Sequence, residues 1–350
     1  MKFNPLAHTG IQLPEICLGT MTFGEQNTQA EAFDQLNYAL DQGLYFWDTA
    51  EMYPVPPKAE TQGATEQIIG NWIQQHGQRD RLFLASKIAG PGFGGGAIRQ
   101  GLTRFNRQHI QQALDGSLQR LQTDYIDLYQ LHWPERHTNF FGHLGFGNQL
   151  AAKHEHNLTA MEETLDALHQ EIQKGRIRFI GLSNETPWGT MKFLHLAEKM
   201  NLSKLVTVQN PYSLLNRSYE VGMSEIAKYE GIGLLAYSPL AFGMLTGKYR
   251  HGAKPANGRI TLFSRFSRYT NPECEWATEQ YAQLAEKHGL TLTQLALAFI
   301  KQQFFVTSTI IGATSMAQLK ENITAFDIEL NEEILQEIEA IHKQQPNPAP

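Results

Sequence analysis

Hydrophobic and polar positions alternate along the chain in one recurring pattern. Short runs of β-branched and aromatic residues end in small or polar residues, and each is followed by a longer stretch with apolar residues at helical spacing. Near-continuous apolar runs are typical of strands buried on both faces of a parallel sheet, with helices as crossovers. The pattern predicts strands at 16–21, 45–50, 82–87, 126–132, 177–183, 207–212, 233–239 and 308–313.

The stretches between these runs predict amphipathic helices. They cover 30–42, 65–75, 108–121, 159–174, 187–200 and 219–229, and a polar helix follows at 331–343. Eight strands alternating with helices favour an α/β fold with a single (β/α)8 TIM barrel. A doubly wound open sheet, which usually has fewer strands, is the alternative. Thr9-Gly10 lies between two short extended runs and predicts an N-terminal β-hairpin that caps the barrel bottom.

Three long stretches interrupt the alternation, at 89–105, 133–157 and 241–271. Each follows a predicted strand, so each predicts a long loop at the C-terminal face, where barrel enzymes build their active sites. No composition shift marks an internal boundary. We therefore expect one barrel domain over residues 1–345 and a flexible Pro-rich tail at 346–350.

Composition narrows the class of protein. The chain has 350 residues, 41% hydrophobic and 18% charged, which is typical of a globular protein. The net charge of −6 leaves no excess of Lys and Arg for nucleic acid or an acidic membrane. Two cysteines form no disulfide framework and the histidines match no common zinc spacing, so we expect no metal. With no signal-peptide pattern and no bilayer-length apolar stretch, we expect a cytoplasmic protein. The sequence does not indicate its oligomeric state.

Four ionisable residues lie at the ends of consecutive predicted strands. Asp48 ends the second strand, Tyr53 follows in the adjoining loop, Lys87 ends the third strand, and His132 ends the fourth. Neighbouring barrel strands place their C-terminal ends side by side, so we expect these groups to converge at the barrel mouth.

These residue types suit proton transfer to a carbonyl oxygen. A free tyrosine has a pKa of about 10, which a neighbouring ammonium lowers by favouring the phenolate. A carboxylate keeps the lysine charged and oriented, and a histidine can align the carbonyl oxygen. Each residue also has an ordinary structural role. Asp48 could cap a helix, Lys87 could reach solvent, and His132 could be a satisfied, partly buried side chain.

Four segments resemble the aldo-keto reductases, in the branch of Tas-like reductases near the potassium-channel β-subunits. They are 47–53 (WDTAEMY), 86–87 (SK), 127–133 (DLYQLHW) and 174–184 (KGRIRFIGLSN). The resemblance spans the whole barrel. It implies a catalytic tetrad with Tyr53 as general acid, Lys87 and Asp48 as the groups that tune it, and His132 orienting the carbonyl.

The same resemblance implies a nicotinamide cofactor across the barrel mouth. Ser183, Asn184 and Gln209 match the residues that hold the carboxamide, and Tyr237 matches the aromatic that stacks on the nicotinamide. The remaining matching residues are Gly19, Thr20, Met21, Asp48, Ser238, Pro239, Leu240, Gly243, Lys248, Arg259, Gly312, Thr314, Ser315, Gln318, Glu321 and Asn322. The segment after Gly312 also opens onto a helix N-terminus, whose donors suit phosphate binding or simple capping, and the resemblance favours binding of the adenosine end of the cofactor.

The choice of NADP over NAD depends on basic residues for a 2′-phosphate. Many family members have a basic residue after the position of Thr314, where this chain has Ser315 and Met316. Lys248 and Arg259 match phosphate-binding residues in related proteins and favour NADP.

The resulting prediction is an NADPH-dependent reductase of aldehydes and ketones. Its substrate is a small carbonyl compound, with Trp47, Tyr53 and Trp133 in the substrate pocket. One alternative is a cofactor-sensing regulatory protein with slow chemistry. Another is a barrel isomerase or lyase for phosphorylated sugars that uses no nicotinamide.

Overall fold

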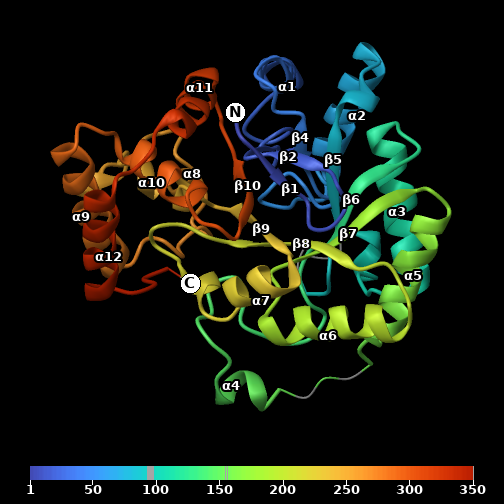
Figure 1. Ribbon diagram of the computed structural model, residues 1–350. Coiled ribbons are helices and arrows are strands. Elements are labelled where there is room, and N and C mark those ends of the chain that lie inside the picture. Colours follow the sequence, from blue (N-terminus) through green and yellow to red (C-terminus); the bar gives the residue numbers. More distant parts are fainter. Residues whose placement is uncertain (93–97, 154, 156, 350) are drawn as a thin grey trace.

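The computed structural model describes residues 1–92, 98–153, 155 and 157–349. Within these residues, eight parallel strands form a closed barrel (Figure 1). β10 pairs with β3 and closes the ring, which confirms the TIM barrel and excludes the open sheet. In chain order the strands are β3 (Ile16–Gly19), β4 (Phe46–Asp48), β5 (Phe83–Ile88), β6 (Ile126–Leu131), β7 (Ile177–Ser183), β8 (Leu205–Pro211), β9 (Gly233–Tyr237) and β10 (Val306–Ile311).

The barrel interior is a packed apolar core. β5, β6 and β10 are buried at every position, as expected for strands between a filled interior and a ring of helices. Phe46 and Phe83 meet edge-to-face inside the barrel, with ring centroids 5.2 Å apart. Several strands end earlier than the sequence predicts. β4, for example, ends at Asp48 and not at residue 50, because the chain turns there into the loop that carries Tyr53.

A two-stranded hairpin closes the bottom of the barrel, as predicted. β1 (Phe3–Pro5) pairs antiparallel with β2 (Gln12–Pro14). Leu6 and Leu13 beside these strands are fully buried and join the interior cluster. The hairpin thus seals the apolar end of the barrel and leaves the opposite end for polar chemistry.

Helices surround the strands on all sides in Figure 1. Several begin at a side chain that accepts a backbone N–H; Thr28, for instance, forms a capping box with Glu31. The predicted 219–229 helix starts later, because Ser218–Glu220 is a 3-10 turn and Gly222 has a φ of 92°. The helices that match predictions are α1 (Gln29–Asp41), α2 (Ala64–His76), α3 (Arg107–Leu121), α5 (Met161–Gln173), α6 (Pro187–Lys199), α7 (Met223–Glu230) and α12 (Glu332–Gln344).

Two helices between β9 and β10 are absent from the sequence prediction. They are α9 (Pro272–Lys287) and α10 (Leu292–Lys301). Most of α10 is buried, so it lacks the polar stripe by which an amphipathic helix is recognised. α11 (Met316–Thr324) follows β10, where a helix opening was expected. Together with α12, these helices form the left side of the molecule in Figure 1.

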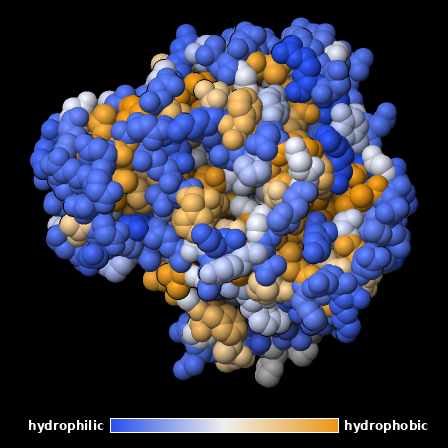
Figure 2. Space-filling view, in the orientation of Figure 1, coloured by the Kyte–Doolittle hydropathy of each residue, from blue (hydrophilic) through white to orange (hydrophobic). Residues whose placement is uncertain are grey.

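The three long loops lie after β5, β6 and β9. Residues 93–97 of the first, and 154 and 156 of the second, lie outside the described residues. The second loop contains α4 (Asn148–Ala151), and the third contains α8 (Arg259–Leu262) and two 3-10 segments. On the face shown in Figure 2, hydrophilic side chains dominate and apolar ones form several separate groups. No helix among the described residues has the length and apolar character needed to cross a bilayer.

Residues 346–349 pack against the barrel, although the sequence predicts a flexible tail. The backbone N–H of Ala349 donates to Leu215 O at 3.2 Å, and Asn347 Oδ1 accepts from Arg217 N at 2.6 Å. Asn271 Nδ2 donates to Pro348 O at 2.8 Å, and Ala349 is fully buried. Pro350 lies outside the described residues.

Candidate active site

Four ionisable side chains meet where β4, β5 and β6 end at the barrel mouth. Lys87 lies between two of them, with its Nζ 2.6 Å from Asp48 Oδ2 and 3.2 Å from Tyr53 Oη. The rings of Tyr53 and His132 meet edge-to-face, with centroids 5.7 Å apart. All four side chains are buried. The structure therefore brings together the residues that the sequence predicts as a reaction centre.

Further hydrogen bonds hold the Asp48–Lys87 pair in place. Asp48 Oδ1 accepts from Gln209 Nε2 at 2.8 Å and from Gln130 Nε2 at 3.3 Å. Lys87 Nζ also donates to Thr49 O at 2.8 Å. Gln130 pairs with Lys87 in the strand register and is absent from the sequence prediction. An amide in the middle of an apolar strand was the signal that could have revealed it.

Burial and neighbouring charges shift the pKa values of Tyr53, Lys87 and His132. Burial raises the pKa of Tyr53; Lys87 acts to lower it but does not outweigh burial. The direction is therefore opposite to the lowering that the sequence predicts. Burial also acts to lower the pKa of Lys87, yet Asp48 and Tyr53 outweigh it and the pKa is raised. Burial, with a smaller contribution from Lys87, lowers the pKa of His132 well below its usual value. At neutral pH the site therefore holds a phenol, an ammonium and a neutral imidazole.

Glu51 connects the loop of Tyr53 to the end of β5. Its backbone N–H donates to Lys87 O at 3.2 Å, and its Oε1 accepts from Ala89 N at 2.6 Å. Its Oε2 accepts from Arg99 Nη1 in a partly buried ion pair. The sequence shows Glu51 inside the 47–53 segment but gives it no role. In the structure it fixes the spacing between Lys87 and Tyr53.

A cavity of about 980 Å³ opens above the tetrad. Tyr53, His132 and Trp133 line it. The residues predicted for a cofactor that also line it are Gly19, Thr20, Met21, Asp48, Ser183, Asn184, Gln209, Tyr237, Ser238, Pro239, Leu240, Gly243, Lys248, Arg259, Gly312, Thr314, Gln318, Glu321 and Asn322. Tyr237 Oη donates to Asn184 Oδ1 at 2.5 Å, and Asn184 Nδ2 donates to His132 O at 2.8 Å. One hydrogen-bonded chain thus runs from the wall of the cavity to the tetrad.

Comparison with known families decides the class of the protein. Residues 15–343 match the family model described as "Aldo/keto reductase family". The chain belongs to the aldo/keto reductase family. The resemblance seen in the sequence is confirmed, and the chain is an oxidoreductase by family.

Three relatives show where the chain lies within the family. It is 51% identical over 350 residues to Protein tas of Escherichia coli (strain K12), with both chains covered in full. It is 34% identical over 340 residues to the uncharacterized oxidoreductase YrpG of Bacillus subtilis (strain 168), covering 96% of this chain and 94% of the relative. It is 30% identical over 351 residues to a putative voltage-gated potassium channel subunit beta of Schizosaccharomyces pombe, covering 97% and 93%. These relatives agree with the predicted Tas-like branch.

The cavity of this aldo/keto reductase is rich in uncompensated positive charge. Lys248, Arg259, Arg265 and Arg268 line it, and none has a carboxylate partner among the described residues. Burial and the charge of Arg259 lower the pKa of Lys248. Because the whole chain carries a net charge of −6, this local excess indicates a binding site for an anion.

The segment after β10 behaves as a helix cap in this structure. Ser315 Oγ accepts from Gln318 N at 3.3 Å and lies outside the cavity lining. The Gln318 side chain accepts from Thr314 N at 2.9 Å. These bonds cap α11 with the same backbone donors that a phosphate would use.

Trp47 lies away from the cavity, although the sequence predicts it in the substrate pocket. It is fully buried and meets Trp72 of α2 edge-to-face, with centroids 4.8 Å apart. Its Nε1 donates to Leu44 O at 2.9 Å. Successive side chains of a strand point to opposite faces, so when Asp48 faces the mouth Trp47 faces the helices. Trp133 does line the cavity, as predicted.

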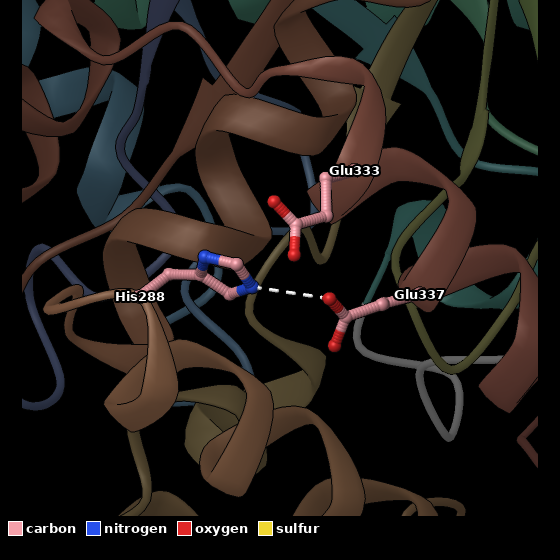
Figure 3. A group of neighbouring side chains, drawn as sticks. All are labelled: His288, Glu333 and Glu337. Carbon is pink, nitrogen blue, oxygen red and sulfur yellow. Dashed lines mark hydrogen bonds and ion pairs between the residues drawn. The ribbon is translucent and has the colours of Figure 1, made fainter.

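A second group of ionisable side chains lies outside the cavity, at the C-terminal end of α9. Figure 3 shows His288 with Glu333 and Glu337 of α12, and His288 Nε2 is 3.3 Å from Glu337 Oε1. Lys287 Nζ donates to both Glu337 oxygens, at 2.8 and 3.0 Å. A cation bound here would have to displace that ammonium, so the group is accounted for by ion pairs between two helices.

Proposed function

We propose that the protein is an NADPH-dependent reductase of aldehydes and ketones that also catalyses the reverse alcohol oxidation. The observation that carries this proposal is the buried Lys87, held between Asp48 and Tyr53 at the base of a cationic cavity. The aldo/keto reductase family and the oxidoreductase name of one relative support it.

The cavity suits a nicotinamide dinucleotide in size and in charge. Its volume of about 980 Å³ exceeds what a small carbonyl compound needs. Ser183, Asn184 and Gln209 present the polar groups that would hold the carboxamide, beside the ring of Tyr237. Lys248 and Arg259 would hold phosphates, and their positive charge favours NADP over NAD.

The tetrad residues each have a distinct part in carbonyl reduction. The reduced nicotinamide supplies the hydride for the carbonyl carbon. Tyr53 keeps its proton at neutral pH, because burial raises its pKa, and donates it to the carbonyl oxygen. Lys87, 3.2 Å away, stabilises the phenolate that forms, and Asp48 holds Lys87 in place. The neutral His132 lines the cavity beside Tyr53 and would orient the carbonyl oxygen.

Tyr53→Phe tests this proposal. The variant removes the proton donor and keeps the ring, so turnover of aldehydes falls about 100- to 10,000-fold while the dissociation constant for NADPH stays unchanged. Steady-state rates with several aldehydes and NADPH fluorescence titration give both values. Undiminished turnover in the variant would refute the role of Tyr53.

A second candidate function is that of a cofactor-binding, redox-sensing regulatory protein with slow reductase chemistry, and the relative named as a putative potassium channel subunit favours a regulatory role. Tight NADPH binding by the wild type, with negligible turnover of any aldehyde, would support that function over metabolic reduction. The sugar-phosphate isomerase or lyase alternative does not fit the family to which the chain belongs.

A further inference from the structure

Arg268 differs from the other cations of the cavity in also reaching the loop after β6. Lys248 lies against Gly243, since a Cβ added to that glycine would be 2.8 Å from Lys248 Nζ. The Arg259 guanidinium lies 5.7 Å from the centroid of the Phe242 ring. The Arg268 guanidinium lies 5.9 Å from the centroid of the same Phe242 ring and, unlike Arg259, also lies over the ring of Phe141, at 5.8 Å. A Cβ on Gly142 would be 3.9 Å from its Nε. Arg268 therefore reaches from the loop after β9 to the loop after β6.

Aromatic contacts connect this position to the reaction centre. Phe141 meets Trp133 with ring centroids 5.9 Å apart, and Trp133 meets His132 at 4.8 Å. His132 lies beside Tyr53. A ligand with its carbonyl at Tyr53 and His132 would lie along Trp133 and Phe141, with its far end toward Arg268.

The wall between these two ends is apolar. Six residues of one hydrophobic cluster line the cavity: Met21, Met52, Tyr53, Val55, Trp133 and Phe141. Arg268 also lies near the hydroxyls of Tyr237 and Tyr269, and it has no carboxylate partner among the described residues. An apolar pocket that ends at a guanidinium is suited to a ligand with an apolar body and an anionic end.

We propose that Arg268 binds a carboxylate of the carbonyl substrate, so that the preferred substrates are anionic aldehydes or ketones with an apolar body. This proposal rests on the proposed reductase function and adds the substrate class to it. Arg268 is then a specificity-determining residue and takes no part in proton or hydride transfer.

Two aldehydes of similar shape test the proposal: 4-carboxybenzaldehyde and the neutral 4-isopropylbenzaldehyde. Their kcat/KM values are measured for the wild type, Arg268→Met, Arg268→Lys and Arg265→Met. Arg265 is an exposed cation at the rim of the same cavity and serves as the matched control. Comparing ratios between variants cancels the intrinsic reactivities of the aldehydes.

We expect Arg268→Met to lower kcat/KM for the carboxylate about 10- to 100-fold, mainly through KM, and to leave the neutral aldehyde within about threefold. Arg268→Lys restores part of the loss, and Arg265→Met leaves the ratio unchanged. Calorimetric binding of 4-(hydroxymethyl)benzoate with NADP+ present weakens by the same factor, while the NADPH dissociation constant does not change.

Equal losses for both aldehydes, or a matching rise in the NADPH dissociation constant, would overturn the proposal and assign Arg268 to the cofactor. If the wild type reduces the neutral aldehyde and Arg268→Met leaves the ratio unchanged, this inference fails while the reductase function stands. A wild type that reduces neither aldehyde would overturn both.

Discussion

Positive charge is held in two different ways on the two sides of the cavity. On the side of β4 and β5, Lys87 is fully buried against Asp48 at 2.6 Å. On the side of the loop after β9, Lys248 and Arg259 face the cavity without a carboxylate partner in the described part of the chain. The buried Asp48–Lys87 pair neutralises its own charge within the protein and fixes the position of the ammonium. Lys248 and Arg259, which have no such partner, are suited to bind an anionic ligand that neutralises their charge. Chemistry and binding are therefore separated in space.

Lys87→Met removes the Asp48–Lys87 ion pair and has the largest expected effect. Turnover falls about 100- to 10,000-fold because Tyr53 loses the ammonium that stabilises its phenolate. The free energy of unfolding falls by about 3–5 kcal/mol, because the Asp48 carboxylate is left buried and unpaired. Denaturant unfolding and steady-state rates measure both changes.

A second substitution shows whether the stability loss comes from Asp48. Asp48→Asn in the Lys87→Met background removes the stranded charge, so stability returns in large part while turnover stays low. A double variant as unstable as Lys87→Met would contradict the pairing.

Arg259→Met breaks the unpaired side, and its expected effect is on binding alone. The NADPH dissociation constant rises about 10- to 100-fold, since a charge-assisted contact to phosphate is lost. Stability does not fall, because no carboxylate is left unpaired. NADH binding serves as the reference, and Arg250→Met, which removes a cation already paired with Glu279, is the control. An equal loss for NADH would show that Arg259 does not contact the 2′-phosphate.

Glu51→Gln sharpens the comparison, because it changes a residue that holds the loop of Tyr53 and leaves the Asp48–Lys87 pair itself intact. The amide can still accept from Ala89 N but loses the ion pair with Arg99, so Tyr53 is positioned less firmly. We expect kcat to fall about tenfold with little change in KM for NADPH. Glu66→Gln, a buried carboxylate paired with Arg120, is the matched control and should leave kcat closer to the wild type. The reverse order would remove Glu51 from the positioning of Tyr53.

The smallest expected effect concerns His132 and is a pH dependence of the free energy of unfolding. Its pKa is depressed by burial, so its contribution is present above the usual value of 6.5 and is lost as the pH falls below that value. Between pH 6.5 and 5, wild-type stability should fall more steeply than that of His132→Asn, by up to about 1.4 kcal/mol per pH unit. Exposed His195→Asn is the control. Parallel slopes for His132→Asn and wild type would contradict the depressed pKa.

The barrel and the tetrad could be predicted from the sequence because both follow from local patterns. Apolar runs fix the strands, and parallel strands bring Asp48, Lys87 and His132 to one mouth. α10 could not be predicted, because a helix buried on most sides has no polar stripe to reveal its period. The contacts of the tail with Leu215, Arg217 and Asn271 could not be predicted either, since these residues are distant from it in sequence.

Within the site, the sequence did not reveal which way each side chain points or how deeply it is buried. Trp47 is next to Asp48 in sequence, but the strand turns its side chain to the opposite face. The net shift in the pKa of Tyr53 depends on how deeply the ring is buried, which a neighbouring lysine in the sequence does not reveal. Gln130 and Glu51 act through hydrogen bonds that only the folded chain forms.

Single-turnover hydride transfer at saturating NADPH, measured for Tyr53→Phe and Arg259→Met in parallel with the NADPH dissociation constant, tests the separation of chemistry from binding. We predict that Tyr53→Phe loses the transfer rate with an unchanged dissociation constant. Arg259→Met should bind NADPH more weakly and transfer hydride at the wild-type rate. Loss of the transfer rate in Arg259→Met, or weakened binding in Tyr53→Phe, would contradict it.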